Sequence, residues 1–76
     1  EGRLEVDYVV ETRAGDWIGV EVKLGDSQID SAATSLLRLA ARVGRAPKAL
    51  VVVTATSLAY TREDGVRVVP LGLLGP

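Results

Sequence analysis

Residues 5–23 read EVDYVVETRAGDWIGVEVK, and the predicted fold is organised around this stretch. Its two halves, 5–11 and 17–23, each alternate apolar and polar residues, which is the period of a strand with one buried face. The short polar break between the halves contains Gly15, so the stretch predicts an antiparallel hairpin. Within each strand, residues two positions apart project from the same face.

The register of this hairpin depends on the length of its loop. A two-residue turn at Ala14-Gly15 places Tyr8 opposite Glu21, whereas a three-residue loop that also includes Arg13 places Asp7 opposite Glu21. The three-residue loop is a common form, in which a type I turn is followed by a residue in the left-handed region. Its last residue is a glycine, which adopts that conformation without steric cost, so we expect the longer loop.

The three-residue loop also determines which side chains share a face of the predicted hairpin. One face carries apolar residues and is expected to form the hydrophobic surface of the sheet: Val6, Tyr8, Val10, Ile18, Val20 and Val22. The other face carries carboxylates and one amine: Glu5, Asp7, Glu21 and Lys23. This charged face is either a functional site or a solvated surface, where cross-strand ion pairs are worth roughly 0.2–1 kcal/mol each. Glu11 is expected near the turn, facing solvent.

Composition excludes several classes of protein. The chain has 76 residues, which indicates one domain near the lower size limit for independent stability. Its net charge is −1, which by itself does not indicate binding to nucleic acid. It has no cysteine and no histidine, so disulfide scaffolds, thiolate or histidine metal sites and histidine-based catalysis are excluded. No apolar run approaches the roughly 20 residues that span a bilayer, so we expect no membrane association. The absence of cysteine fits a cytoplasmic location, which we expect for this chain.

The segment after the hairpin predicts one helix over residues 28–43. Ser27 is suited to cap its start, and Asp30 stands three residues later, as in a capping box. Gly44 is the expected C-terminal residue. The apolar stripe at three-and-four spacing consists of Ile29, Ala32, Ala33, Leu36, Leu37, Ala40 and Val43.

The remaining residues predict more strands. Residues 48–54 form a continuous β-branched run, which indicates a buried central strand reached by a parallel crossover. Residues 58–62 and 66–71 predict a second hairpin, turned at 63–65. The apolar end, 71–76, is expected to pack on a neighbour, as in a homo-oligomer. The predicted fold class is therefore α/β: a small mixed sheet with two hairpins and one crossover helix.

An Asp on one strand and a Glu-X-Lys sequence on the next are typical of metal-assisted phosphodiester cleavage. Two converging carboxylates bind a hard cation such as Mg²⁺, which keeps several waters and contacts phosphate. The cation polarises the phosphoryl oxygen and lowers the pKa of a bound water. A lysine on the same face positions that water or stabilises developing charge. Glu21 and Lys23 have this spacing.

With these residues the sequence resembles the PD-(D/E)XK nuclease superfamily. The form it resembles is the C-terminal DUF4143 domain of bacterial and archaeal AAA-type ATPases. The resemblance covers most of the chain and is carried by residues 5–11, 17–25, 29–33, 36–39 and 68–72.

The resemblance implies roles for three residues and a context for the chain. Asp7 and Glu21 would be ligands of Mg²⁺ or Mn²⁺, and Lys23 would be the catalytic lysine of a Mg-dependent phosphodiesterase acting on DNA. The chain, 1–76, would be a single nuclease-like domain at the C-terminus of a larger ATPase, with the ATPase module upstream. The superfamily's fold, the restriction-endonuclease-like core, also has a helix before the first strand, which this sequence lacks. The alternative function is a non-catalytic interaction or dimerisation module with a degenerate nuclease fold.

Other residues allow a second kind of contact with nucleic acid. Arg38, Arg42 and Arg45 follow one side of the predicted helix and its end. They either meet phosphates or form a solvated stripe that complements the negative end of the helix dipole. Trp17 and Tyr60 either stack on bases or pack within the domain, Trp17 over the end of the hairpin and Tyr60 on the sheet.

Overall fold

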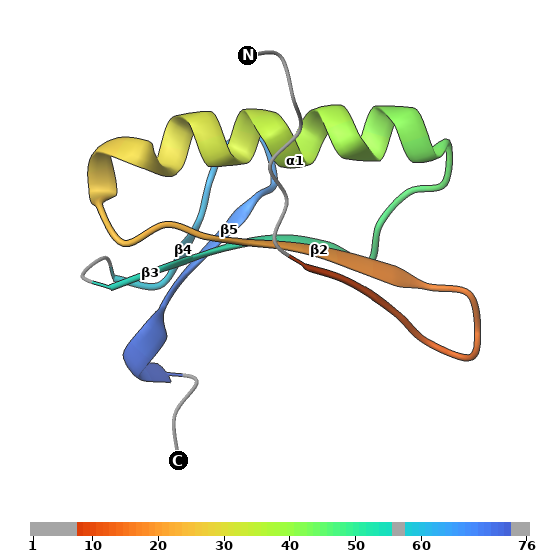
Figure 1. Cartoon of the computed structure of the whole chain (residues 1–76), viewed down its shortest axis with the longest axis horizontal. Coiled ribbons are helices and arrows are strands. Elements are labelled where there is room, and N and C mark those ends of the chain that lie inside the picture. The colour runs from red at the N-terminus through yellow and green to blue at the C-terminus, as the bar shows by residue number, and fades with distance from the viewer. Residues whose placement is uncertain (1–7, 56–57, 74–76) are drawn as a thin grey trace.

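The computed structural model describes residues 8–55 and 58–73, which form one five-stranded mixed sheet with a single α-helix on it (Figure 1). The strands are β1 (Tyr8–Glu11), β2 (Trp17–Val22), β3 (Ala49–Thr54), β4 (Tyr60–Thr61) and β5 (Arg67–Pro70). The helices are α1 (Ile29–Val43) and two short 3₁₀ turns, η1 (Asp26–Gln28) and η2 (Leu71–Leu73). The strand order is β1-β2-β3-β5-β4, so β3 is central. Strand β3 is parallel to β2 and β5, and an antiparallel hairpin closes each edge, which confirms the predicted mixed sheet.

The first hairpin has the predicted three-residue loop. Tyr8 pairs with Val20, which is the register that the longer loop requires. The Thr12 amide donates to the Asp16 carbonyl at 2.9 Å and closes the loop. Gly15, the last loop residue, has a φ of 91°, the left-handed conformation expected of a glycine there.

The second hairpin uses the same loop. The Arg62 amide donates to the Val66 carbonyl at 2.8 Å, and Gly65 has a φ of 90°. The Asp64 carboxylate also accepts a hydrogen bond from the Val66 amide at 3.1 Å. Both edge hairpins of the sheet are therefore turned by three residues that end in glycine, as the sequence predicted at 63–65.

Helix α1 ends as predicted but begins differently. Gly44 takes the left-handed conformation at its C-terminus, with a φ of 79°. The predicted Ser27 cap is wrong: the 3₁₀ turn Asp26–Gln28 comes first, so Gln28 is the N-cap and no side-chain hydrogen bond caps the helix. Asp30, expected in the capping box, binds a distant arginine instead.

The helix buries a narrower stripe than the sequence predicted. Leu37 and Val43 were expected in the stripe but are 38% and 40% exposed. Leu39 packs against the core, together with Ala40. The fully buried helix residues are Ile29, Ala32, Ala33 and Leu36. Leu36 therefore lies at the centre of the contact between α1 and the sheet. Successive helix residues are rotated by about 100°, so Leu37 points away from this contact.

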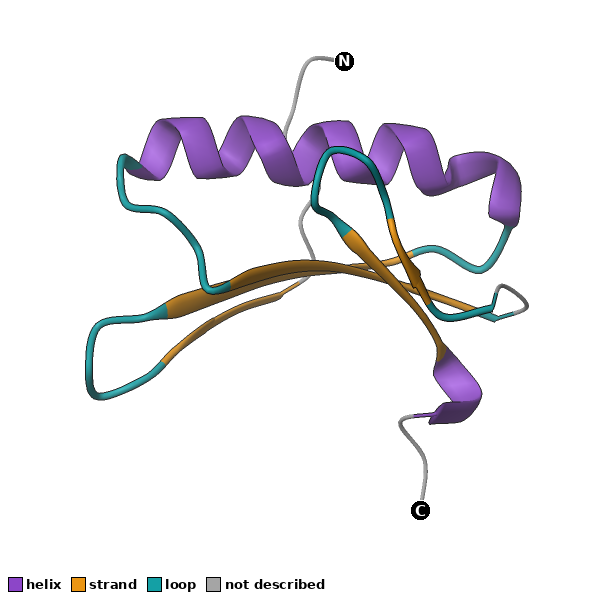
Figure 2. Cartoon of the chain, turned by 180° about the vertical axis from the view of Figure 1, so that it is seen from behind, coloured by secondary structure: helices purple, strands orange, loops and turns teal. Residues whose placement is uncertain are grey.

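The face of the sheet that α1 covers is the opposite of the one expected. In β2 the buried residues are Trp17, Gly19 and Glu21, whereas Ile18, Val20 and Val22 are half-buried on the other face. The expectation that the Tyr8 and Val10 face forms the hydrophobic core is wrong, because these two side chains are 59% and 51% exposed. Figure 2 shows α1 lying along one side of the sheet, whereas the other side carries, among the described helices, only the short turn η2 at the end of β5.

The core lies between α1 and this covered face. Gly19 has a specific role there, because a Cβ at this position would lie 3.1 Å from Leu50 Cδ2 and 3.2 Å from Leu36 Cδ2. A strand glycine of this kind permits close approach of a neighbouring element. Strand β3 completes the core with Leu50 and Val52, and the segment around the start of β5 adds Val66 and Val68. Among the described residues, no helix is both long enough and apolar enough to cross a membrane.

Candidate functional site

The carboxyl ends of the parallel strands β2 and β3 meet at one edge of the sheet, beside the start of α1. Glu21 stands next to the end of β2 and pairs with Val52 of β3. Just after the strand, the Lys23 amide donates to the Val53 carbonyl at 2.8 Å, so Lys23 continues the register. In open α/β sheets, ligands bind at the carboxyl ends of such strands.

Glu21 is buried at this edge with a lysine beside it. Its residue is 1% exposed, and its Oε2 lies 3.6 Å from the Nζ of Lys23. The two residues are two positions apart, so they share the face that α1 covers. A buried carboxylate is costly unless it is paired with a cation or hydrogen-bonded. Of the two alternatives for the charged face, an ordinary solvated surface therefore does not hold for Glu21.

Thr54 adds a buried hydroxyl to the same edge. It ends β3 and is fully buried. It stands two positions after Val52 and therefore lies on the same face of the sheet as Glu21. Sequence analysis missed this residue. The available signal was a polar residue at the end of a β-branched run, directly after Val51-Val52-Val53.

The structure tests the rest of the predicted constellation in part. The pairing of Tyr8 with Val20 is the register that the sequence requires for Asp7 to oppose Glu21. Asp7 and Glu5 themselves lie outside the described residues. Glu11 is exposed near the loop, as expected, and binds Arg45.

The oxygen donors at this edge suit a hard cation better than a metal ion that prefers thiolate or imidazole ligands. Within residues 8–55 and 58–73, no three acidic, histidine or cysteine side chains gather as a metal centre. Mg²⁺ needs fewer protein ligands, because it keeps several waters and is held by one or two carboxylates plus phosphate. Glu21 supplies a buried carboxylate, and Asp7 is the second candidate. The described part of the chain therefore offers one buried carboxylate here, which suits a hard cation held mainly by water and substrate.

A second polar cluster ties the β4–β5 loop to α1. Arg62 Nη1 lies 2.6 Å from the Asp30 carboxylate, and its Nε donates to Asp64 at 3.2 Å. The hydrogen bond to Asp30 raises the pKa of Arg62 above its ordinary value, and Asp64 adds to the shift, while desolvation by burial opposes it. Sequence analysis missed this cluster because its partners are 32 residues apart.

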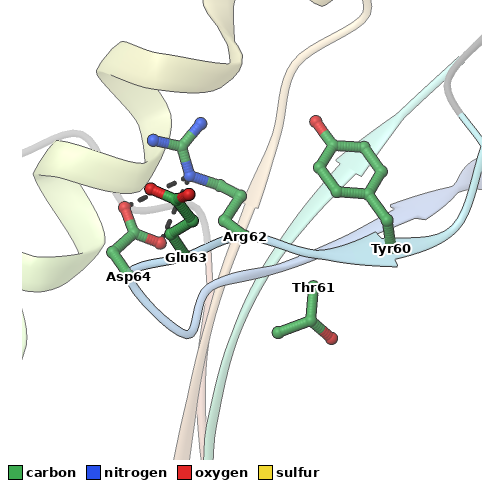
Figure 3. Close-up of a pocket in the computed structure, with 5 residues that line it drawn as sticks. All are labelled: Tyr60, Thr61, Arg62, Glu63 and Asp64. Atoms are coloured by element: carbon green, nitrogen blue, oxygen red, sulfur yellow. Dashed lines mark hydrogen bonds and ion pairs between the residues drawn. The ribbon is translucent and has the colours of Figure 1, made fainter.

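This cluster borders an open hollow of about 480 Å³. The residues that line it are Tyr60, Thr61, Arg62, Glu63 and Asp64. Figure 3 shows the Arg62 guanidinium turned toward Asp64, with Thr61 pointing the other way. The guanidinium is already bound by two carboxylates of the chain. The cluster is therefore better explained as a structural link between the loop and α1 than as part of a binding site. Tyr60, expected to pack on the sheet, is 46% exposed at its edge.

The tryptophan and the arginines have separate roles. Trp17 is 1% exposed, and its Nε1 donates to the Arg45 carbonyl at 3.0 Å, so it belongs to the core and is not a base-stacking surface. The Arg45 side chain binds Glu11 at 2.9 Å. Arg38 and Arg42 are exposed on α1.

The fold and the edge site define a small mixed α/β domain with a βαβ unit, whose buried polar residues gather where two parallel strands end. The family described as "Domain of unknown function (DUF4143)" matches residues 1–74, and the chain belongs to this family. No curated protein and no solved structure matches the chain.

Proposed function

We propose that this chain is a metal-dependent, nuclease-like domain of the PD-(D/E)XK type, which acts on DNA as the C-terminal module of an ATPase. One observation carries the proposal: the buried Glu21 carboxylate lies 3.6 Å from the Lys23 ammonium, at the carboxyl ends of adjacent parallel strands. A buried carboxylate such as Glu21 is costly unless it is compensated, and an apolar residue of similar volume is often as stable, so its presence beside a partly exposed lysine supports a functional role.

The residues take the following roles in the proposal. Asp7 and Glu21 hold Mg²⁺ or Mn²⁺. Such a cation supplies a polarised phosphoryl oxygen and a bound water of lowered pKa. Glu21 acts from a site shielded by α1, where its charge is screened less than on the surface. Lys23 is 26% exposed, so its ammonium reaches a phosphate at the surface and stabilises the charge that develops there.

Binding of the cation is tested on the 76-residue chain by NMR. We expect Mn²⁺ at millimolar concentration to broaden the amide signals of residues 21–23 saturably, and we expect Glu21→Gln and Asp7→Ala to remove the effect. Glu63→Gln is the matched control, because Glu63 is an exposed carboxylate in the β4–β5 loop. No saturable broadening in the wild type would exclude a cation site here.

The cleavage step is tested with the full-length protein. It is incubated with linear and branched DNA plus Mn²⁺, as wild type and as Lys23→Ala. We expect the variant to lose at least ~100-fold in rate, the usual scale for one group that stabilises transition-state charge. Equal cleavage by both proteins would remove Lys23 from the mechanism.

The open face of the sheet favours a second candidate function, a non-catalytic interaction or dimerisation module. Tyr8 and Val10 are more than half exposed there, beside the half-buried Ile18, Val20 and Val22. Parallel sheets are normally covered on both faces, and exposed apolar patches of this kind mark interfaces. The predicted apolar end contributes less: Leu71 is 49% exposed in η2, and residues 74–76 lie outside the described residues.

Sedimentation of the 76-residue chain tests this candidate. We expect a concentration-dependent dimer that Val20→Lys abolishes, because the substitution places a charge in the middle of the open face. Ala41→Lys adds the same charge to an exposed position of α1 and is expected to leave the dimer intact. A wild-type monomer at every concentration would exclude self-association through this face.

A further inference from the structure

Positive charge is concentrated at one end of the molecule, away from the Glu21 site. The C-terminal end of α1, the segment that follows it and the β1–β2 loop lie at this end (Figure 1). Five cationic side chains are exposed there: Arg13, Arg38, Arg42, Arg45 and Lys48. The whole chain has a net charge of −1, so this is a local excess and not a general property.

Three contacts hold these parts together at one end of the molecule. Arg45, just past the helix, lies with its Nη2 2.9 Å from the Glu11 carboxylate at the end of β1. Its Nη1 is 3.7 Å from the position that a Cβ on Gly15 would take. The Lys48 amide donates to the Trp17 carbonyl at 2.7 Å and attaches the same segment to the start of β2. The end of α1 and the hairpin loop are therefore fixed relative to each other.

The carboxylates at this end are already neutralised. Glu11 binds Arg45, and Asp16 lies 3.9 Å from Lys48. Arg13, Arg38 and Arg42 form no ion pair in the described part of the chain. This leaves three exposed arginines facing solvent.

Helix electrostatics explain only part of this arrangement. A cation in the last turn complements the negative end of the helix dipole, and Arg42 is in that position. The effect falls off within one turn, so it does not account for Arg38, five residues before the end of α1. Arg13 belongs to a different element, the β1–β2 loop. Arg13, Arg38 and Arg42, which form no ion pair in the described part of the chain, therefore come from two elements at the same end of the molecule, and this excess of positive charge points to an anionic partner.

We propose that this basic end binds the phosphate backbone of duplex DNA. Arginine forms planar, bidentate hydrogen bonds with phosphate, and such contacts position a protein on DNA without reading its sequence. The choice of DNA among polyanions rests on the proposed nuclease-like function. The surface itself is separate from the cation site, because Trp17–Val22 lies between them, about 3.3 Å per residue along β2.

The test measures DNA binding without any metal. Fluorescence anisotropy of a labelled duplex is recorded in EDTA, from about 50 to 200 mM salt, a range over which phosphate contacts lose affinity steeply. We expect Arg13→Gln/Arg38→Gln/Arg42→Gln to weaken binding at least tenfold and to reduce the slope of log K against log salt by about 2.7, which is ~0.9 for each lost phosphate contact. Circular dichroism confirms that the exposed substitutions leave the fold intact.

A matched pair of single substitutions gives the sharper comparison. Arg42→Gln should reduce the salt slope by about 0.9. Arg67→Gln removes the same charge from an exposed position on β5 and should leave the slope unchanged. Equal effects of the two would overturn the proposal, because binding would then follow net charge alone. Unaltered binding by the triple variant would overturn it as well.

Two further experiments distinguish this proposal from the nuclease proposal and from binding to other anionic partners. Glu21→Gln should bind DNA as the wild type does in EDTA; if it does so yet no DNA is ever cleaved with Mn²⁺, the nuclease proposal fails and the basic end stands. Vesicles with phosphatidylserine and a poly-glutamate peptide are titrated in parallel. If either binds as tightly as the duplex, the partner is a membrane surface or an acidic protein and the proposal for DNA is wrong.

Discussion

Replacing Gly19 by alanine tests the close approach of α1 to the sheet, on which the burial of Glu21 depends. The added Cβ would meet Leu50 Cδ2 at 3.1 Å, Leu36 Cδ2 at 3.2 Å and Trp17 Cζ3 at 3.3 Å. These atoms come from β3, α1 and β2, so the methyl group is enclosed from three elements. Leu36 is 0% exposed and Trp17 is 1% exposed, which leaves both little room to move.

The expected cost combines two opposing terms. Overpacking a close-packed core costs about 1–3 kcal/mol. Replacing a strand glycine reduces the entropy of the unfolded chain and returns about 0.5–1 kcal/mol. Gly19→Ala should therefore lower the free energy of unfolding by about 1 kcal/mol, and the melting temperature of so small a domain by about 4–8 °C. Gly19→Val adds two more methyl groups and should cost about 3 kcal/mol or more.

Guanidinium denaturation followed by Trp17 fluorescence measures the effect, because Trp17 is the single tryptophan of the chain and borders the site. Gly25→Ala is the control: Gly25 has an ordinary φ of −99°, and its Cβ would meet only Ser27 Oγ at 3.9 Å. It should change stability by less than about 0.5 kcal/mol. If Gly19→Ala is as stable as the wild type, α1 can move away from the sheet and close approach is not required.

Two other substitutions test the connections at the sheet edges. Arg62→Gln removes the contacts to Asp30 and Asp64 and should cost about 0.5–1 kcal/mol, because Asp30 is 90% exposed. The hydrogen bond to Asp30 raises the pKa of Arg62. The contribution of Arg62 to the free energy of unfolding is therefore present below the ordinary arginine pKa and is lost only as the pH rises through the raised pKa. The deficit of the variant, measured by denaturation, should thus be equal at pH 7 and pH 9; a deficit that disappears by pH 9 would contradict this. Gly15→Ala forces a φ of 91° on a residue with a Cβ and should cost about 1–2 kcal/mol, with Gly15→Asn less damaging; equal stability of Gly15→Ala and wild type would refute the loop assignment.

The helices and strands and their order along the chain were mostly predictable, because they depend on interactions between residues close in sequence. The alternating runs around Gly15, the β-branched run of β3 and Gly44 each act through neighbours in sequence, and the hairpins, the central strand and the end of α1 were predicted from them. The hairpin register was also predictable, because loop length and the position of Gly15 determine it. The start of α1 was not, since a 3₁₀ turn displaced the expected Ser27 cap.

The candidate site was predictable in its spacing but not in its burial. The spacing of two positions between Glu21 and Lys23 shows that they share a face of the sheet. It does not show which face the helix covers. Period-two patterns leave this choice open when one face carries valines and the other carries a tryptophan and a glycine. The contact with Leu36 decided it, because Gly19 lets α1 pack closely only on the side of Trp17 and Glu21.

The sequence by itself determined the elements, their order and the three-residue loops, because these depend on backbone preferences within a few residues. The tertiary structure alone decided which face became the core, that Thr54 joined Glu21 at the strand ends, and that Arg62 reached Asp30. Each of these results depends on side chains far apart in the chain meeting across a packed interface. Such meetings follow from the volumes of all the packed side chains together, which no local pattern encodes.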